Sequence, residues 1–163
     1  MEIKVVDNFL NPLDFQEIKN HTTFPAKWNT QVSDRDRRDH ISEFLEIVVS
    51  DKDFFNNHIF HKIEKHLDGK YDIERIYFNG QWSGREGQHH RDGCDLTVLF
   101  YISDYEFGWG GFTEILTEPN PTVIHPCTNR LLIFPGNIMH KGYSFSYQHC
   151  PMRINLAYKL IAK

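Results

Sequence analysis

From Tyr71 to the end of the chain, apolar and polar residues alternate with a period of two, and turn residues interrupt the alternation every eight to twelve positions. Such short alternating segments are typical of half-buried β-strands. We therefore expect seven strands, at residues 73–79, 95–103, 111–116, 121–125, 130–134, 139–145 and 152–160. So many short strands can bury their apolar faces in a double-sheet β architecture.

The first 70 residues follow a different pattern. Residues 3–9 predict a short strand, and Asn11 with Pro12 predicts the start of a helix that runs to about His21, because Asn caps helices well and Pro suits the first helical position. Residues 25–40 are polar and charged, which predicts a solvated loop or, alternatively, a lid over a substrate. We expect this segment and the loop at 144–150 to be the least ordered parts of the chain.

A second helix is expected from Asp51 or Asp53, either of which can cap it, to about residue 67. Four apolar residues recur at every fourth position along it and form one stripe, which should pack on the sheet: Phe55, Ile59, Ile63 and Leu67. Two helices followed by a run of strands predict a mainly β fold with flanking helices. We expect one domain over residues 1–163, with helical support at about 1–70 and a β core at about 71–163.

Composition excludes several classes of protein. The hydrophobic fraction of 40% and the charged fraction of 25% are ordinary for a soluble globular chain. The net charge of −4 gives no electrostatic reason to expect nucleic-acid or membrane binding. The three cysteines, Cys94, Cys127 and Cys150, do not suggest a disulfide framework, and the sequence has neither a signal-peptide pattern nor a membrane-length apolar run. We therefore expect a cytoplasmic protein.

The segment Gln88–Gly93 contains the pair of residues with the clearest chemistry. His90 and Asp92 are two apart, so on an extended backbone their side chains share one face, while His89 points to the other. A neutral imidazole and a carboxylate are two of the three ligands in the facial triad of non-haem Fe(II) sites. Taken alone, His90 is equally compatible with a hydrogen-bonded turn histidine.

Further motifs follow this segment in a fixed order: Trp109-Gly110-Gly111-Phe112-Thr113, Arg130–Gly136, His140 and Arg153-Ile154-Asn155. With these motifs, residues from about Ile73 to Leu160 resemble the 2-oxoglutarate- and Fe(II)-dependent oxygenases, on the prolyl-4-hydroxylase-like side. The resemblance implies a double-stranded β-helix, or jelly roll. It assigns the iron to His90, Asp92 and His140, with His125 and His149 as the competing imidazoles.

The resemblance also implies a binding site for the co-substrate. Arg153 would hold the far carboxylate of 2-oxoglutarate, because a guanidinium matches a carboxylate with two parallel hydrogen bonds. If Arg153 does not, Lys159 and Arg130 are the next candidates. Five further side chains fall on strand faces that would line this pocket, or just upstream of the metal motif, and could contact co-substrate or substrate: Thr97, Tyr101, Tyr77, Asn79 and Asn155. Plain strand packing is the alternative for each of them.

The implied activity is Fe(II)- and 2-oxoglutarate-dependent hydroxylation of a C–H bond by O2, with ascorbate as an optional reductant. The expected substrate is a prolyl residue in a peptide or protein, or free proline. Two alternatives are the same chemistry on a small molecule or alkylated nucleic acid, and a non-catalytic metal-binding jelly-roll module. The run from Arg153 to Lys159 partly resembles the Arg-x-Asn-x-Thr-x-Arg motif of nucleic-acid demethylases but departs from it at Ala157 and Lys159.

Overall fold

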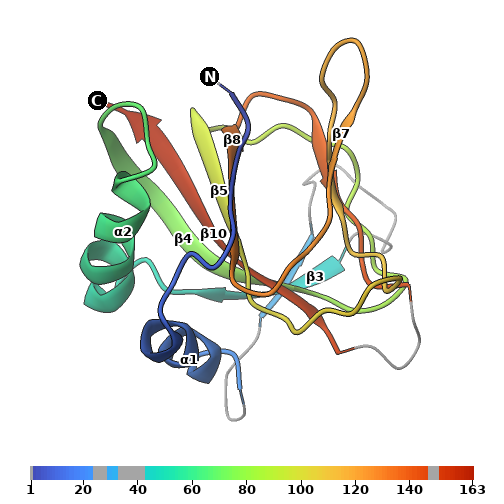
Figure 1. Ribbon diagram of the computed structural model, residues 1–163, viewed down its shortest axis with the longest axis horizontal. Helices are drawn as coiled ribbons and strands as arrows, with labels where there is room; N and C mark the ends of the chain where they lie inside the picture. The colour runs from blue at the N-terminus through green and yellow to red at the C-terminus, as the bar shows by residue number, and fades with distance from the viewer. Residues whose placement is uncertain (1, 24–28, 33–42, 147–150) are drawn as a thin grey trace.

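The computed structural model describes residues 2–23, 29–32, 43–146 and 151–163. Two antiparallel sheets face each other, and the helices cover the outer face of the larger one (Figure 1). This arrangement is the double-sheet β architecture with flanking helices that the sequence predicts. None of the described helices is both long enough and apolar enough to span a membrane.

The major sheet has seven strands in the order β1-β8-β5-β10-β4-β3-β2. Their bounds are β1 Lys4–Val6, β2 Asn29–Val32, β3 Glu43–Val48, β4 Tyr71–Gln81, β5 Leu96–Tyr101, β8 Arg130–Pro135 and β10 Arg153–Ala162. The central pair, β4 and β10, runs antiparallel from Arg153 opposite Gln81 to Ala162 opposite Tyr71. The two longest strands therefore pair with each other near the centre of the major sheet.

The minor sheet has three strands in the order β7-β6-β9, with bounds β6 Thr113–Ile115, β7 Thr122–Ile124 and β9 His140–Gly142. An isolated bridge pairs His90 with His140 at its free edge, and a second bridge pairs Gly110 with Phe145. The segment that carries His90 thereby closes over the space between the two sheets.

Helix α1 (Pro12–Asn20) begins as predicted, because the Asn11 side chain accepts hydrogen bonds from the backbone N–H groups of Leu13 and Asp14 at 3.0 Å. The second helix begins as a π-helix, η2 (Phe54–Ile59), and continues as α2 (Phe60–Glu64). It ends before residue 67. Of the two predicted caps, Asp51 and Asp53, it is Asp53 that occupies the N-cap position, but its side chain makes no cap hydrogen bond.

The apolar stripe of this helix packs on the major sheet as predicted. Phe55, Ile59 and Ile63 are buried, and Leu67 packs at the edge of the same cluster. From the sheet, alternate residues of β4, β5 and β10 enter this core, and their neighbours face the minor sheet. The main hydrophobic core thus lies between helices and sheet, which leaves the inter-sheet side free for polar groups.

All seven strands predicted from residue 71 onward are present, several of them shorter than expected, and residues 3–9 contain β1. The sequence reading missed β2 and β3, so the first 70 residues supply three strands as well as the helices. Residues 29–32, predicted as loop, form β2. Strand β3 lacks a clean alternation because its inward residue, the buried Glu46, is charged. The remainder of 25–40 and residues 147–150, including the expected lid, lie outside the described residues.

Candidate active site

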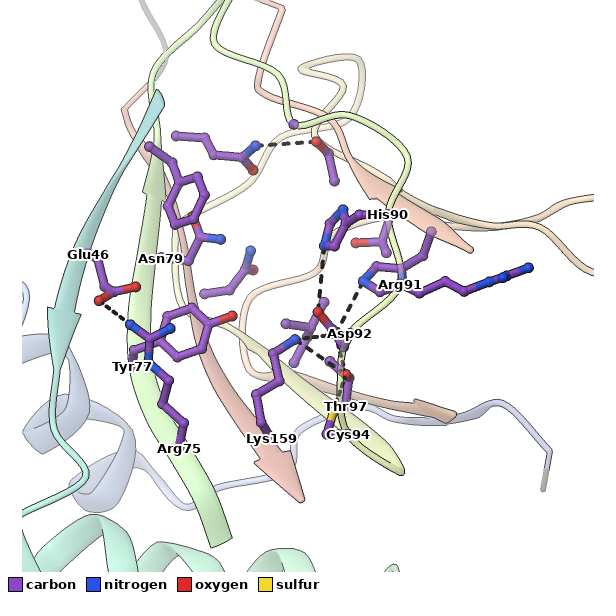
Figure 2. Close-up of a pocket in the computed structure, with 18 of the residues that line it drawn as sticks. Glu46, Arg75, Tyr77, Asn79, His90, Arg91, Asp92, Cys94, Thr97 and Lys159 are labelled. Atoms are coloured by element: carbon purple, nitrogen blue, oxygen red, sulfur yellow. Dashed lines mark hydrogen bonds and ion pairs between the residues drawn. The ribbon is translucent and has the colours of Figure 1, made fainter. Parts of the chain in front are cut away.

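A cavity of about 760 Å³ opens between the two sheets. Its floor consists of polar residues that alternate along the inner face of the major sheet: Tyr77, Asn79 and Gln81 of β4, Thr97 of β5, and Arg153, Asn155 and Lys159 of β10. The segment 89–94 forms the opposite side, so that His90 and Asp92 face β4 and β10 across the opening (Figure 2). Period-two alternation therefore brings residues that are far apart in sequence onto one surface.

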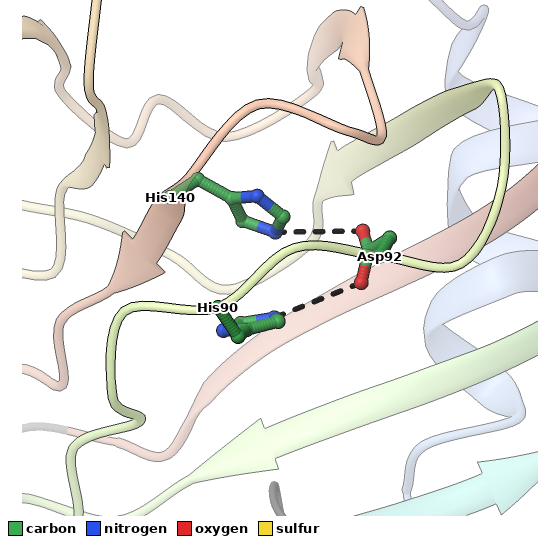
Figure 3. A group of neighbouring side chains, drawn as sticks. All are labelled: His90, Asp92 and His140. Atoms are coloured by element: carbon green, nitrogen blue, oxygen red, sulfur yellow. Dashed lines mark ion pairs between the residues drawn. The ribbon is translucent and has the colours of Figure 1, made fainter.

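His90, Asp92 and His140 come together at one side of this cavity, with one potential ligand atom from each residue within 4.8 Å of the others (Figure 3). His90 Nε2 lies 3.7 Å from Asp92 Oδ1, and His140 Nε2 lies 3.4 Å from Asp92 Oδ2. The reciprocal backbone hydrogen bonds of the bridge, both 2.9 Å, fix the spacing of the two histidines. The predicted convergence of these three side chains is confirmed.

Both imidazoles are held in the tautomer that a metal requires. Nδ1 of His90 lies 2.8 Å from the Gln88 carbonyl oxygen, and Nδ1 of His140 lies 2.8 Å from that of Ile138. A carbonyl only accepts, so each Nδ1 carries the proton and each Nε2 presents a lone pair. Burial, and then the neighbouring His140, lower the pKa of His90, which favours the neutral ligand form.

Asp92 is held by two donors on the major sheet. The Thr97 hydroxyl and the Lys159 ammonium both donate to Asp92 Oδ2, and Lys159 Nζ also lies 3.3 Å from Thr97 Oγ1. Although burial opposes it, the adjacent Lys159 ammonium, through its charge and its hydrogen bond, holds the pKa of Asp92 well below its usual range. Asp92 is therefore ionised, and its Oδ1, which points towards His90, keeps free lone pairs for a cation.

The other histidines do not join this group. His89 borders the cavity, but its Nε2 lies 2.6 Å from Glu114 Oε2, on the outward side of β6. His125 packs its ring near Phe112 and is not part of the cluster, and His149 lies outside the described residues. Among the described histidines, only His90 and His140 face the common point.

Arg153 lies in the same cavity and is 2% exposed. Its guanidinium donates to Gly111 O at 2.8 Å, to Gln81 Oε1 at 2.6 Å and to Thr113 Oγ1 at 3.0 Å, and every one of these acceptors is neutral. No carboxylate in the described parts of the chain forms an ion pair with it. A buried cation with only neutral partners favours an anionic ligand, because an unpaired buried charge is costly.

The double glycine, Gly110-Gly111, contributes to the group of neutral acceptors around Arg153. Gly111 has φ of +75°, and a Cβ at that position would lie 2.5 Å from the Phe145 ring and 3.5 Å from Arg153 Cδ. Only glycine lets the backbone turn here while its carbonyl oxygen accepts from Arg153. Glycine at position 111 therefore permits the close approach of this turn to Arg153.

The remaining predicted co-substrate residues occupy different positions. Tyr101 lies beneath Arg153, whose Cζ is 5.6 Å from the Tyr101 ring centroid, and its hydroxyl pairs with Thr113 Oγ1 at 2.7 Å. Asn79 and Asn155 face each other across β4 and β10, and each has a buried Oδ1 without a hydrogen-bond partner among the described residues. Both line the cavity, so unsatisfied polar atoms face the place where a ligand would lie.

Sequence reasoning missed three residues. Lys159 appeared only as a reserve anion anchor, yet it pairs with Asp92; the other reserve, Arg130, pairs with Asp7 instead. Gln81 received no role, although it holds Arg153 and donates to Gly142 O at 3.3 Å. Glu46 lies on a strand that was not predicted. The alternation along 153–159 was the available signal for Lys159, because it places this residue on the face of Arg153.

Comparison with known proteins agrees with this geometry. No protein-family model matches the chain, and no curated protein matches its sequence. Many solved structures match its fold. A viral collagen prolyl hydroxylase from Paramecium bursaria Chlorella virus-1, solved as a 2-oxoglutarate complex, has a TM-score of 0.68 at 18% identity, over 100% of this chain and 97% of that chain. The chain has the fold of the 2-oxoglutarate- and Fe(II)-dependent oxygenases.

Two further matches show different kinds of ligand bound to proteins of this fold. A prolyl hydroxylase from Trichoplax adhaerens, in complex with a peptide fragment of hypoxia-inducible factor, has a TM-score of 0.75 at 16% identity, over 98% of this chain and 83% of that chain. HygX from Streptomyces hygroscopicus, with nickel, 2-oxoglutarate and hygromycin B bound, has a TM-score of 0.68 at 8% identity, over 99% and 83% of the two chains. The expected jelly roll is confirmed, and proteins of this fold are seen with peptides and with small molecules.

Proposed function

We propose that this protein is an Fe(II)- and 2-oxoglutarate-dependent dioxygenase that hydroxylates a C–H bond. One observation carries the proposal: a His-Asp-His triad and a buried arginine, which has no carboxylate partner among the described residues, face the same cavity. A keto acid such as 2-oxoglutarate needs two binding points: a metal for its keto-acid end, here at the triad, and a cation for its far carboxylate, here the arginine. The fold of the matched oxygenases supports this reading.

The donor set fits Fe(II). Two neutral imidazole nitrogens and one carboxylate oxygen form a facial set that leaves coordination positions open, as non-haem Fe(II) oxygenases require. His90, Asp92 and His140 would hold the metal, while Thr97 and Lys159 orient the carboxylate and the carbonyls of Gln88 and Ile138 orient the rings. Mutation of such supporting residues typically lowers metal affinity by about 10- to 100-fold.

Arg153 would bind the far carboxylate of 2-oxoglutarate, with Thr113 and Tyr101 fixing the guanidinium. The unpartnered oxygens of Asn79 and Asn155 lie in the same cavity and would order water or ligand there. When bound, Fe(II), 2-oxoglutarate and O2 together supply the oxidation: the keto acid becomes succinate and CO2, and one oxygen atom enters a substrate C–H bond as hydroxyl. The chain itself binds, orients and shields these reactants.

For the substrate, we propose a prolyl group, in a peptide or protein in the first instance. The support is that prolyl hydroxylases from several sources match the fold, one of them with a peptide bound. A small molecule is the second candidate, because the cavity wall carries charged groups and HygX was solved with hygromycin B bound. Nucleic acid is the weakest candidate, given the net charge of −4.

The experiment that tests this function is the measurement of succinate formed from 2-oxoglutarate by the Fe(II)-loaded protein, with and without added substrates. We expect slow succinate formation alone and faster formation with a proline-containing substrate, and ascorbate should prolong the activity. Asp92→Asn should abolish succinate formation both with and without the added substrate. Absence of succinate under every condition would leave the non-catalytic metal-binding module as the better explanation.

A further inference from the structure

The wall of the cavity that faces the triad carries a pair of charges that the proposed metal and keto acid do not use. Glu46 on β3 and Arg75 on β4 both line the cavity, and Arg75 Nη2 donates to Glu46 Oε1 at 2.5 Å. Figure 2 shows this pair across the opening from His90 and Asp92, with Tyr77 and Lys159 between them. A substrate that occupies the cavity beside the triad can therefore contact the pair.

Glu46 has an unusual environment for a carboxylate. Its side chain is only 3% exposed, and burial of a carboxylate is costly unless its oxygens are bonded. Arg75 bonds Oε1, whereas no described residue donates to Oε2. One oxygen of a buried, cavity-lining carboxylate is thus free to accept a hydrogen bond from a positively charged ligand.

Arg75 is placed to bind the opposite charge. Its guanidinium lies over the Tyr77 ring, with Cζ 4.6 Å from the ring centroid, and its side chain is 45% exposed at the mouth of the cavity. Only Nη2 is used by Glu46, and no described residue accepts from Nε or Nη1. Stacking on Tyr77 holds the plane of the guanidinium while its edge still presents donors.

A free acceptor and free donors of opposite charge thus lie side by side on one wall. A free α-amino acid carries an ammonium and a carboxylate on one carbon and can engage both groups at once. An internal residue of a peptide carries neither charge, so it can form hydrogen bonds with these two side chains but no ion pair. We propose that Glu46 and Arg75 bind the ammonium and carboxylate of a free α-amino acid, whose side chain then extends towards the triad.

This inference rests on the proposed function and narrows its substrate: the prolyl ring would be presented as free L-proline rather than within a peptide. The test compares the protein L-amino acids, each free and as its N-acetyl amide, together with a proline-rich peptide, for stimulation of succinate formation. We expect stimulation by at least one free amino acid, with L-proline tested first. We expect its N-acetyl amide and the peptide to stimulate at least about tenfold less at equal concentration, since the ion pairs with Glu46 and Arg75 are both lost.

Three variants test whether Glu46 and Arg75 are responsible for stimulation by a free amino acid. Glu46→Gln keeps the shape and removes the charge, and should raise the KM for the amino acid by about 10- to 100-fold. Arg75→Met should do the same, and Arg75→Lys should recover part of the loss, because an ammonium keeps the charge without the fork. Glu64→Gln on α2, on the other side of the major sheet, is the matched control and should leave the KM unchanged.

The outcomes separate the two proposals. If wild-type protein neither binds 2-oxoglutarate nor forms succinate, the proposed function itself fails. If it binds 2-oxoglutarate but the blocked amides or the peptide work as well as the free amino acids, the inference about the charged pair is wrong. The same holds if no free amino acid stimulates, or if Glu46→Gln leaves the KM unchanged. A direct titration of 2-oxoglutarate into each variant reports whether the rest of the site is intact.

Discussion

Replacing Gln81 with Glu should weaken 2-oxoglutarate binding while it leaves the metal ligands in place. Gln81 Oε1 accepts from Arg153 Nη1 at 2.6 Å, so Gln81→Glu puts a carboxylate in direct contact with the guanidinium at almost unchanged volume. The arginine would then be neutralised by the protein, and the far carboxylate of the co-substrate would meet a like charge. At an effective dielectric constant of about 20, two unit charges about 4 Å apart interact by about 4 kcal/mol.

Exposure of the open cavity reduces that energy, so we expect the Kd of 2-oxoglutarate to rise by about 100- to 1,000-fold, which corresponds to roughly 3–4 kcal/mol. The assay is calorimetric titration of 2-oxoglutarate into protein loaded with Mn(II), a redox-stable substitute for iron. Gln81→Met, which removes the hydrogen bond without adding charge, is the control and should cost only about tenfold. The Mn(II) affinity itself should change little in both variants, because neither touches the triad.

A negative charge at position 81 should also change which ligand the protein prefers. The neutral analogue 2-oxoglutaramate, with an amide in place of the far carboxylate, should bind wild-type protein much more weakly than 2-oxoglutarate does. In Gln81→Glu the difference in affinity between 2-oxoglutarate and 2-oxoglutaramate should become smaller or change sign. Equal affinity of wild-type protein and Gln81→Glu for 2-oxoglutarate would refute the claim that Arg153 is the anion anchor.

Three further predictions test other parts of the structure. Arg153→Met should cost about 10- to 100-fold in 2-oxoglutarate affinity with the metal still bound, and Arg153→Lys should recover only part; the same titration measures both, and unchanged affinities would place the tail elsewhere. Thr97→Val removes a donor to Asp92 Oδ2 and should weaken metal binding by about tenfold, measured by competition with a chelator; unaltered metal affinity would contradict the positioning role. Phe55→Ala empties a fully buried position between helix and sheet and should destabilise the fold by about 3–5 kcal/mol in urea unfolding, and a loss below about 1 kcal/mol would mean that the helix does not anchor the sheet.

Much of this fold was predictable because the alternation of apolar and polar residues within each strand is visible in short stretches of the sequence. Alternation along β4, β5 and β10 places every second residue of a strand on one face, and this puts Arg153 and Asn155 on the same side of β10. The convergence of His90 with His140 required the resemblance to a known fold, because no local pattern joins residues separated by 50 positions. Whether the individual co-substrate residues act as predicted is still a prediction.

The features that were not predicted depend on long-range contacts. Strand β3 does not alternate cleanly, since Glu46 takes an inward position that is apolar in an ordinary strand and is bonded by Arg75 from β4. Lys159 reads as a solvent-exposed lysine near the end of a chain until its pairing with Asp92 is seen. Gln81 is an ordinary strand residue in the sequence, and only the register of β4 with β10 places it opposite Arg153.

The most direct test of the account is an anaerobic titration of 2-oxoglutarate into Fe(II)-loaded protein, followed by the metal-to-ligand absorption band that a chelated keto acid produces. The account predicts a band that saturates at one equivalent in wild-type protein, requires a much higher 2-oxoglutarate concentration in Arg153→Met, and is absent in His140→Ala. If wild-type protein shows no band although Fe(II) is bound, or if His140→Ala shows the same band, the triad and the arginine do not form one site.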